Sequence, residues 1–140
     1  MSILTTVTFR FQTPAGPETV WRSLTDEPRH FPGLTIDSDW RAGSTVRLGS
    51  GGLAIVGRVL RCEPVARLSH TLGDHPARPE VYVTWELTPI AGGTVVELYV
   101  DELGDGRDIT GARPEDIAEI ESAWQPVVDA LRTVIDRCIR

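Results

Sequence analysis

Six short β-type segments follow one another between residues 35 and 101, and this run constrains the fold more than any other feature of the sequence. Glycine or proline stands at most of the junctions, and such close spacing predicts hairpins joined into an antiparallel meander. In residues 81–87 and 94–100 apolar and polar residues alternate, so we expect one buried and one solvated face. The expected strands are 35–41, 44–49, 54–63, 66–73, 80–89 and 93–101.

The residues before this run predict one more strand and two short helices. Residues 3–12 alternate in the manner of a half-buried strand. Residues 17–25 predict a helix, because Pro17 suits the first helical position and the segment carries one apolar face. Residues 27–32 are expected to form a second short helical turn.

Residues 114–139 predict a long final helix, because apolar residues recur every three or four positions over several turns. Pro126 conflicts with this pattern, since a proline inside a helix removes a backbone donor and clashes with the preceding turn. Either one helix kinks at Pro126, or a short helix ends near residue 121 and a second begins with Ser122 as its cap. The apolar stripe keeps its phase through Pro126, which favours one kinked helix.

Composition indicates one globular domain over residues 1–140 and narrows the classes of partner. The net charge is −6, which argues against a nucleic acid or an anionic membrane as a partner, because both require a concentrated basic surface. All 14 basic residues are arginine, and the absence of lysine excludes Schiff-base chemistry and a phosphate-loop lysine. We expect a monomer or a weak dimer.

The two cysteines and the N-terminal segment predict a cytoplasmic protein. Cys62 and Cys138 lie too far apart in sequence for a metal-ligand pair, and they are expected to be buried free thiols in a reducing compartment. The first residues lack a basic stretch followed by an apolar one, and no segment has the length of a membrane span.

The predicted elements leave room for an internal pocket. A twisted sheet of seven strands has one large apolar face, and a single helix about 36 Å long cannot cover that face without a gap. Where sheet and helix diverge, a cavity lined mostly by apolar side chains can remain. The residues expected to line it are Trp40, Leu68, His70, Leu72, Val83, Trp85, Val96, Leu98, Val100, Trp124, Val128 and Leu131.

Four stretches carry a resemblance that, together with the final helix, extends over nearly the whole chain: PAGPETVWRSLTDE (14–27), SDWRAGSTVRL (38–48), GRVLRCEPVARLSHTL (57–72) and VTWELTPIAGGTVVELYVDE (83–102). With the final helix, they resemble the START-like (SRPBCC) superfamily, and most closely the bacterial homologues of the activator of heat-shock-protein-90 ATPase. The resemblance implies an α+β helix-grip fold, in which a curved antiparallel seven-stranded sheet wraps around a long C-terminal helix, with two short helices after the first strand. Relatives often carry His at the position of Val100 and Tyr or Phe at the position of His70.

His70 is the only candidate for a catalytic residue. It alternates with Leu68 and Leu72, so it shares their buried face and either hydrogen-bonds a ligand, moves a proton, or is a satisfied core histidine. No catalytic triad, metal-ligand spacing or phosphate loop is present, so we predict neither a metal nor a cofactor.

The favoured hypothesis is a protein that binds a hydrophobic small molecule without acting as an enzyme. Three alternatives stay open: a polyketide cyclase or aromatase that uses His70, a co-chaperone-like protein-interaction domain, and antibiotic self-resistance by sequestration. These three alternatives follow from the functional diversity of the superfamily, since a fold alone implies only a pocket.

Overall fold

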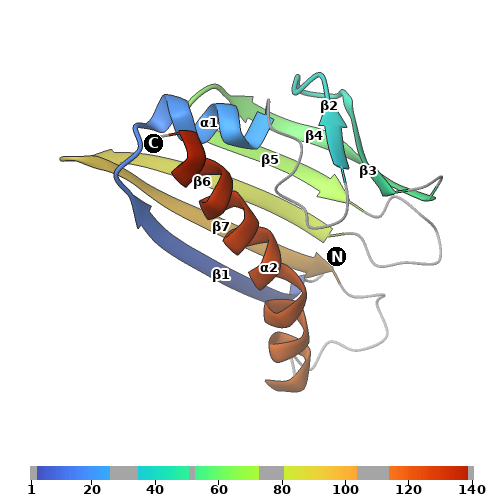
Figure 1. Ribbon diagram of the computed structural model, residues 1–140. Coiled ribbons are helices and arrows are strands. Elements are labelled where there is room, and N and C mark those ends of the chain that lie inside the picture. Colours follow the sequence, from blue (N-terminus) through green and yellow to red (C-terminus); the bar gives the residue numbers. More distant parts are fainter. Residues whose placement is uncertain (1–2, 26–34, 51–52, 73–80, 104–113, 139–140) are drawn as a thin grey trace.

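A computed structural model describes residues 3–25, 35–50, 53–72, 81–103 and 114–138. It contains one sheet and two helices in chain order (Figure 1): β1 (Ile3–Thr13), α1 (Pro17–Thr25), β2 (Thr35–Ser38), β3 (Thr45–Ser50), β4 (Leu53–Glu63), β5 (Arg67–Leu72), β6 (Val81–Ile90), β7 (Gly93–Leu103) and α2 (Pro114–Cys138).

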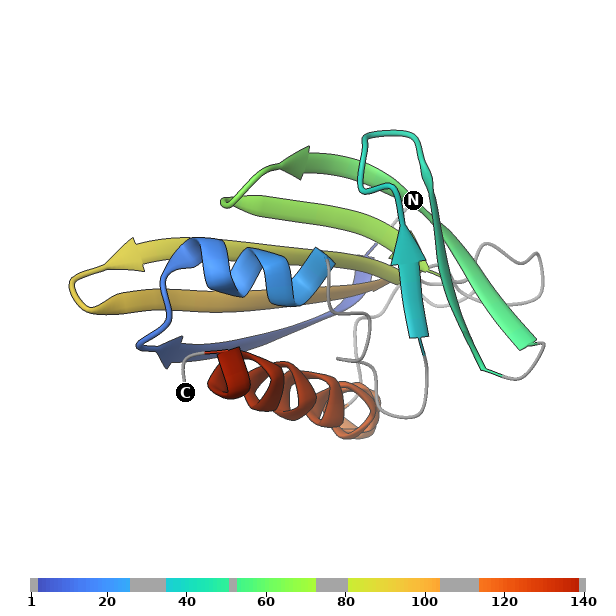
Figure 2. The same ribbon diagram turned by 45° about the horizontal axis from the view of Figure 1, so that its top comes forward.

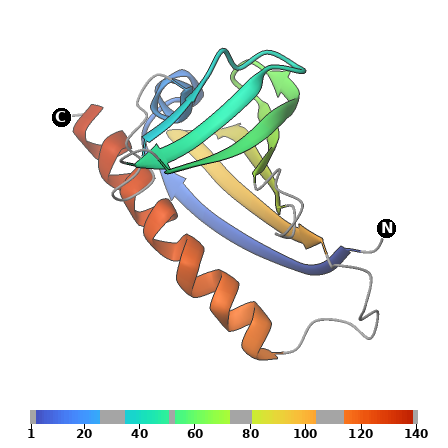
Figure 3. The same ribbon diagram turned by 90° about the vertical axis from the view of Figure 1, so that its right-hand side faces the viewer.

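All neighbouring strands of the seven-stranded sheet are antiparallel, and their order is β1-β7-β6-β5-β4-β3-β2. Strands β2 to β7 form the expected meander, and β1 joins it beside β7. The sheet curves so that β2 and β3 rise to the side on which both helices lie (Figures 2 and 3). Helix α1 contacts β6, β7 and α2, and α2 also packs on β1. The helices therefore cover the concave side of the sheet.

Strand β4 carries the bend of the sheet. Its first half pairs with β3 and its second half with β5, and the register with β5 shifts between Val59 and Arg61. Close to this point the backbone of β5 lies against Gly57, where a Cβ atom would stand 1.7 Å from the carbonyl oxygen of Thr71. Only glycine permits two strands to approach so closely. The backbone N–H of Arg58 donates to the Thr71 hydroxyl instead of to a ladder carbonyl.

The strand register arranges the concave face in rows that run across the sheet. One row consists of Val7, Val100, Val83, His70 and Val59, on β1, β7, β6, β5 and β4. All five side chains are buried. Because adjacent strands place paired residues on the same face, each row packs as a continuous strip against the helices.

A neighbouring row consists of Phe9, Leu98, Trp85, Leu68 and Cys62. Its three central members are fully buried, whereas the two at its ends are only half-buried. Helix α2 contributes the opposite layer of the core through residues spaced three and four apart, which are Val127, Val128, Leu131 and Ile135.

The helix-grip fold and the curved seven-stranded sheet expected from the sequence are confirmed. Helix α2 runs without interruption through Pro126, so the alternative of two separate helices is wrong. The second short helical turn, predicted at 27–32, lies outside the described residues. Strand β2 ends at Ser38, earlier than predicted, because Trp40 adopts a positive φ of 53° and the chain turns there into β3.

Candidate ligand-binding site

All twelve residues predicted to line a pocket belong to the concave side of the molecule. Nine are part of one buried core cluster, and Trp40 and Trp124 pack against its edge. His70 lies in the row of valines and contacts the Trp40 ring. The nine core members are Leu68, Leu72, Val83, Trp85, Val96, Leu98, Val100, Val128 and Leu131.

Large aromatic side chains at the border of this core remain partly exposed. Trp124 on α2, Trp40 after β2 and Trp21 on α1 are half-buried, in contrast to Trp85 at the centre, which is 1% exposed. Burial of an aromatic ring gives a large favourable free energy. A half-buried indole on the core side therefore leaves apolar surface exposed that a ligand could still cover. The centre of the concave side is thus fully buried, and its border carries partly exposed aromatic side chains.

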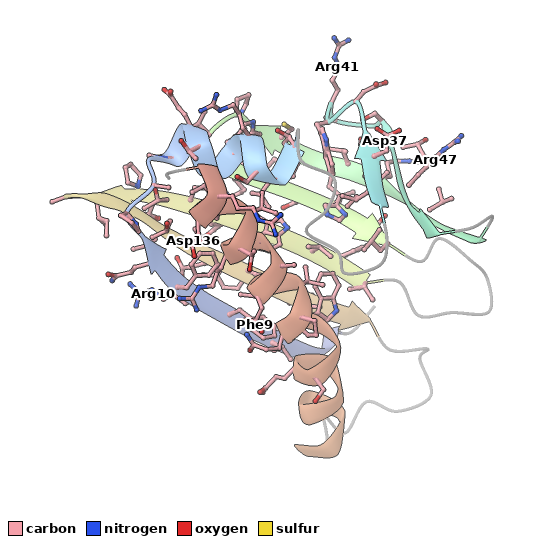
Figure 4. The ribbon with its side chains drawn as sticks, viewed as in Figure 1. Phe9, Arg10, Asp37, Arg41, Arg47 and Asp136 are labelled. Carbon is pink, nitrogen blue, oxygen red and sulfur yellow. The ribbon has the colours of Figure 1, made fainter. Side chains whose placement is uncertain are left out.

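The aromatic residues of β1 were missing from the predicted site. Phe9 and Phe11 point to the concave side and are half-buried, and Phe11 also packs under the guanidinium of Arg132 from α2, 5.2 Å from the ring centroid. Figure 4 shows Phe9 beside α2. The signal was available, because both residues belong to the alternating pattern of residues 3–12. What the sequence did not give is that β1 pairs with β7 and so enters the same concave face.

His70 is positioned by its own strand. Its side chain points inward between Leu68 and Leu72, and only 1% of the residue is exposed. Its Nδ1 atom lies 3.1 Å from the carbonyl oxygen of Thr71. A carbonyl oxygen only accepts, so Nδ1 carries the proton and donates it, and in the neutral ring Nε2 is then an acceptor. The backbone thus fixes the tautomer of the imidazole.

Burial keeps this imidazole neutral. Removal from water lowers the pKa of His70 from 6.5 to about 4, because the charged form loses its hydration, and the hydrogen bond to Thr71 opposes this shift only in part. At neutral pH the imidazole is therefore uncharged, with a proton on Nδ1 and a lone pair on Nε2. Its capacity as a general base is weak, since a catalytic base works best with a pKa near the working pH.

Trp40 forms a wall beside His70. The two rings meet edge to face with centroids 6.0 Å apart and planes inclined at 61°. The indole N–H of Trp40 donates to the Thr25 carbonyl at the end of α1, and its backbone N–H donates to the Ser38 hydroxyl. A left-handed φ is unfavourable for a residue with a bulky side chain. The strand turn, the helix end and the imidazole together hold this conformation.

The ion pairs among the described residues lie on the opposite, convex face. Arg67 pairs with Glu86 across the strands at 2.7 Å, and the Tyr99 hydroxyl donates to Glu97. In Figure 4, Arg41 and Arg47 point away from α2 at the far end of the sheet. Among the described residues, no group of three or more His, Cys, Asp or Glu side chains could hold a metal ion. No helix in the described part of the chain is long and apolar enough to cross a membrane.

A family model matches residues 14–136, which include every element from α1 onward except the last residues of α2. The family is described as activator of Hsp90 ATPase homolog 1-like protein. The chain belongs to this family. The resemblance inferred from the sequence is therefore confirmed. A comparison with curated proteins finds no match.

Solved structures similar to this family member include bacterial proteins of matching length. The protein MLL2253 from Mesorhizobium loti is 25% identical, with a TM-score of 0.73 over 95% of this chain and 98% of its own. A protein from Rhodobacter sphaeroides is 26% identical, with a TM-score of 0.70 over 97% and 92% of the two chains.

One similar structure comes from a biosynthetic context. DynU16, described as a protein in the dynemicin biosynthetic locus, is 25% identical with a TM-score of 0.73. The match covers 94% of this chain but only 47% of the DynU16 chain, so this chain corresponds to about half of that protein.

Proposed function

We propose that this protein binds a hydrophobic small molecule on the concave side of the sheet, under α2. The observation that carries the proposal is the set of half-buried aromatic side chains at the border of a sealed apolar core. Phe9, Trp40 and Trp124 come from a strand, a turn and a helix, and all three pack against the same core. Pockets for small molecules have this composition, with aromatic and apolar walls and few polar groups.

The position of charge supports an uncharged or weakly polar ligand. Among the residues whose side-chain burial the structure describes, His70 is the only buried ionisable one, and the ion pairs lie on the convex face. An ionised group moved among the buried side chains would lose its hydration without a partner of opposite charge, because Arg132, which stacks on Phe11, lies exposed at the border. The ligand is therefore expected to be largely apolar.

No reaction is assigned to the site. A polyketide cyclase or aromatase would need a group that moves protons near neutral pH, and the candidate for that task, His70, has a pKa of about 4. We accordingly favour a binding protein over an enzyme.

A second candidate function is the sequestration of a product of biosynthesis, as in antibiotic self-resistance. The observation that favours it is the likeness to DynU16, a protein of a biosynthetic locus. Sequestration and carriage use the same binding site, and they differ in the ligand and in how slowly it is released.

Titration with small molecules, followed by two-dimensional amide NMR, tests the proposal. The indole N–H groups of Trp21, Trp40, Trp85 and Trp124 are reporters, and the panel contains fatty acids, flavonoids and polycyclic aromatic compounds. We expect saturable shifts at Trp40 and Trp124. Shifts confined to Thr84 and Tyr99 on the convex face, or none for any compound, would contradict the proposal.

A pair of variants separates the site from unspecific adsorption. Phe9→Ala removes a half-buried ring from the concave side, and we expect at least about fivefold weaker binding, because a lost aromatic contact costs roughly 1 kcal/mol or more. Leu60→Ala removes an apolar side chain that is 49% exposed on the outside of β4. This control should bind with unchanged affinity.

A further inference from the structure

The two edge strands of the sheet differ in length and therefore in how many backbone groups they leave free. Strand β2, at one edge, has four residues, and a short edge strand gives another chain little to pair with. Strand β1, at the other edge, has eleven. Within the described part of the chain no strand pairs with its outer side, where every second residue directs an N–H and a C=O group outward.

Strand β1 also lacks the features that usually protect a long edge. Natural edge strands are interrupted by proline, by a bulge or by several charged residues. The pairing of β1 with β7 is regular from Thr5 to Thr13, and Arg10 is the only charged residue of the strand. Its side chains alternate between the apolar concave face and the exposed convex face. The outer edge of β1 is thus suited to accept another strand.

Helix α2 covers the concave face of β1 and not its hydrogen-bonding edge. The helix contacts β1 from that face, where Arg132 lies over the Phe11 ring. In Figures 1 and 3 the first turns of α2 extend past β1. A strand added beside β1 would therefore extend the sheet toward the part of α2 that reaches beyond it.

We propose that β1 pairs antiparallel with β1 of a second copy of this chain, about a two-fold axis at Thr8, so that the two sheets continue into one. Such an interface uses the same surface of both copies. The alternation of β1 restricts the register, because a slip by one residue would place apolar side chains on the polar face. Pairing about Thr8 joins Thr5 to Phe11 and sets Phe9 beside Val7 of the second copy, which continues the apolar rows of the concave face.

The charges on the convex face favour the same register. Pairing about Thr8 sets Arg10 opposite Thr6 of the second copy, whose hydroxyl donates to Asp101 at 2.7 Å. Arg10 and Asp101 of the second copy then lie in one row, two strand spacings or about 10 Å apart between Cα atoms, a separation that an arginine and an aspartate side chain can bridge. The two-fold axis repeats this contact, whereas pairing about Arg10 would oppose two guanidinium groups.

Arg10 is available for such a contact. Among the described residues it forms no ion pair, since the two ion pairs present join other residues. Its neighbour across the strands within the same chain is Glu97, which accepts a hydrogen bond from the Tyr99 hydroxyl. The second copy therefore supplies a carboxylate for a cation that has no ion-pair partner in the described part of its own chain.

Sedimentation equilibrium of the full chain between roughly 10 µM and 1 mM tests the proposal, because small interfaces dissociate in this range. We expect the average mass to rise with concentration toward that of two chains. A mixture of differently isotope-labelled copies should give intermolecular NMR contacts between Val7 and Phe9. The mass of one chain at every concentration would overturn the pairing and leave the edge of β1 to a strand of another protein. Intermolecular contacts confined to other elements would also overturn it.

A charge exchange tests the register. Arg10→Glu and Asp101→Arg should each weaken the dimer by at least about tenfold, because each opposes like charges twice in one interface. The double variant should recover most of the affinity. Arg41→Glu changes the net charge by the same amount as Arg10→Glu, in the exposed turn after β2, and should dimerise as the wild type does (Figure 4).

An unchanged dimer in Arg10→Glu would overturn the register about Thr8. Amide spectra of each variant at low concentration verify that it folds. If a single variant does not fold, the mass and the intermolecular contacts of the wild type decide the question. The proposal is independent of ligand binding, so failure of either one leaves the other intact.

Discussion

The burial of His70 makes the stability of the fold depend on pH, because burial changes the pKa of the imidazole. The imidazole is neutral in the folded protein down to about pH 4, whereas in the unfolded chain it accepts a proton near pH 6.5. Above pH 6.5 both states are neutral and this residue adds no pH dependence. As the pH falls from 6.5 to 4, only the unfolded state gains the proton, so folding becomes less favourable over this window.

A comparison of the wild type with His70→Gln measures this effect. Between pH 7 and pH 5 the free energy of unfolding of the wild type should fall by about 2 kcal/mol more than that of the variant, because glutamine does not titrate. Urea denaturation at several pH values gives both curves, and the carboxylates contribute equally to each. Parallel pH profiles would show that the imidazole is hydrated or paired in the folded state.

Trp40 shows how a single residue is placed by contacts that a sequence pattern does not contain. The sequence pattern predicts a strand over residues 35–41, and alternation alone gives no reason to end that strand at Ser38. Trp40 contacts the Ser38 hydroxyl, the Thr25 carbonyl and the His70 ring in this conformation, and the last two groups come from distant parts of the chain.

At the scale of the element, β4 determines the curvature of the sheet. Gly57 lets β5 approach so closely that the Thr71 carbonyl lies where a side chain would begin. The same carbonyl accepts the hydrogen bond from the Nδ1–H group of His70. The bend of β4 and the orientation of the imidazole therefore depend on one backbone group.

Gly57→Ala should destabilise the protein strongly. The added Cβ would overlap the Thr71 oxygen, and backbone atoms cannot move aside as the end of a flexible side chain can. We expect a loss of more than about 2 kcal/mol in the free energy of unfolding, measured in urea, together with a changed His70 ring signal. Arg58→Ala, next to it and exposed, should change stability by less than about 0.5 kcal/mol. Equal, small effects would refute the close approach.

Element boundaries were largely predictable because the dominant signals are local. Alternation placed the strands within a few residues, and the spacing of apolar residues placed α2. The concave side chains of β5, β6 and β7 followed from the same alternation, and Trp124, Val128 and Leu131 followed from the helical spacing of α2. Pairing was less accessible, because only the strand register decides which side chains meet across the sheet, as Arg67 and Glu86 do.

At the scale of the whole molecule, the first strand, β1, pairs only with the last strand, β7. Phe9 of β1 pairs with Leu98 of β7, 89 positions later, and no other strand covers that side of β7. Ends so distant must be brought together before their contacts provide any free energy, and this slows folding. The remaining strand pairs are all between neighbours in sequence.

We therefore expect refolding from urea in the range of milliseconds to seconds, as is usual for domains rich in distant β contacts. Stopped-flow tryptophan fluorescence measures it, since Trp85 becomes fully buried only when the concave face closes. Any slower phase of tens of seconds should vanish in double-jump experiments that leave the prolines in their native isomers. Complete refolding within microseconds would contradict this topology.

The same topology has a consequence on the ribosome. A nascent chain grows at roughly 5–20 residues per second, so several seconds separate the synthesis of β5 from that of the second half of α2. Until then, the row containing His70 and its valine neighbours lacks the cover of α2. Slow codons in the last third of the message would lengthen this interval, and they would raise aggregation of the nascent chain without changing a single amino acid.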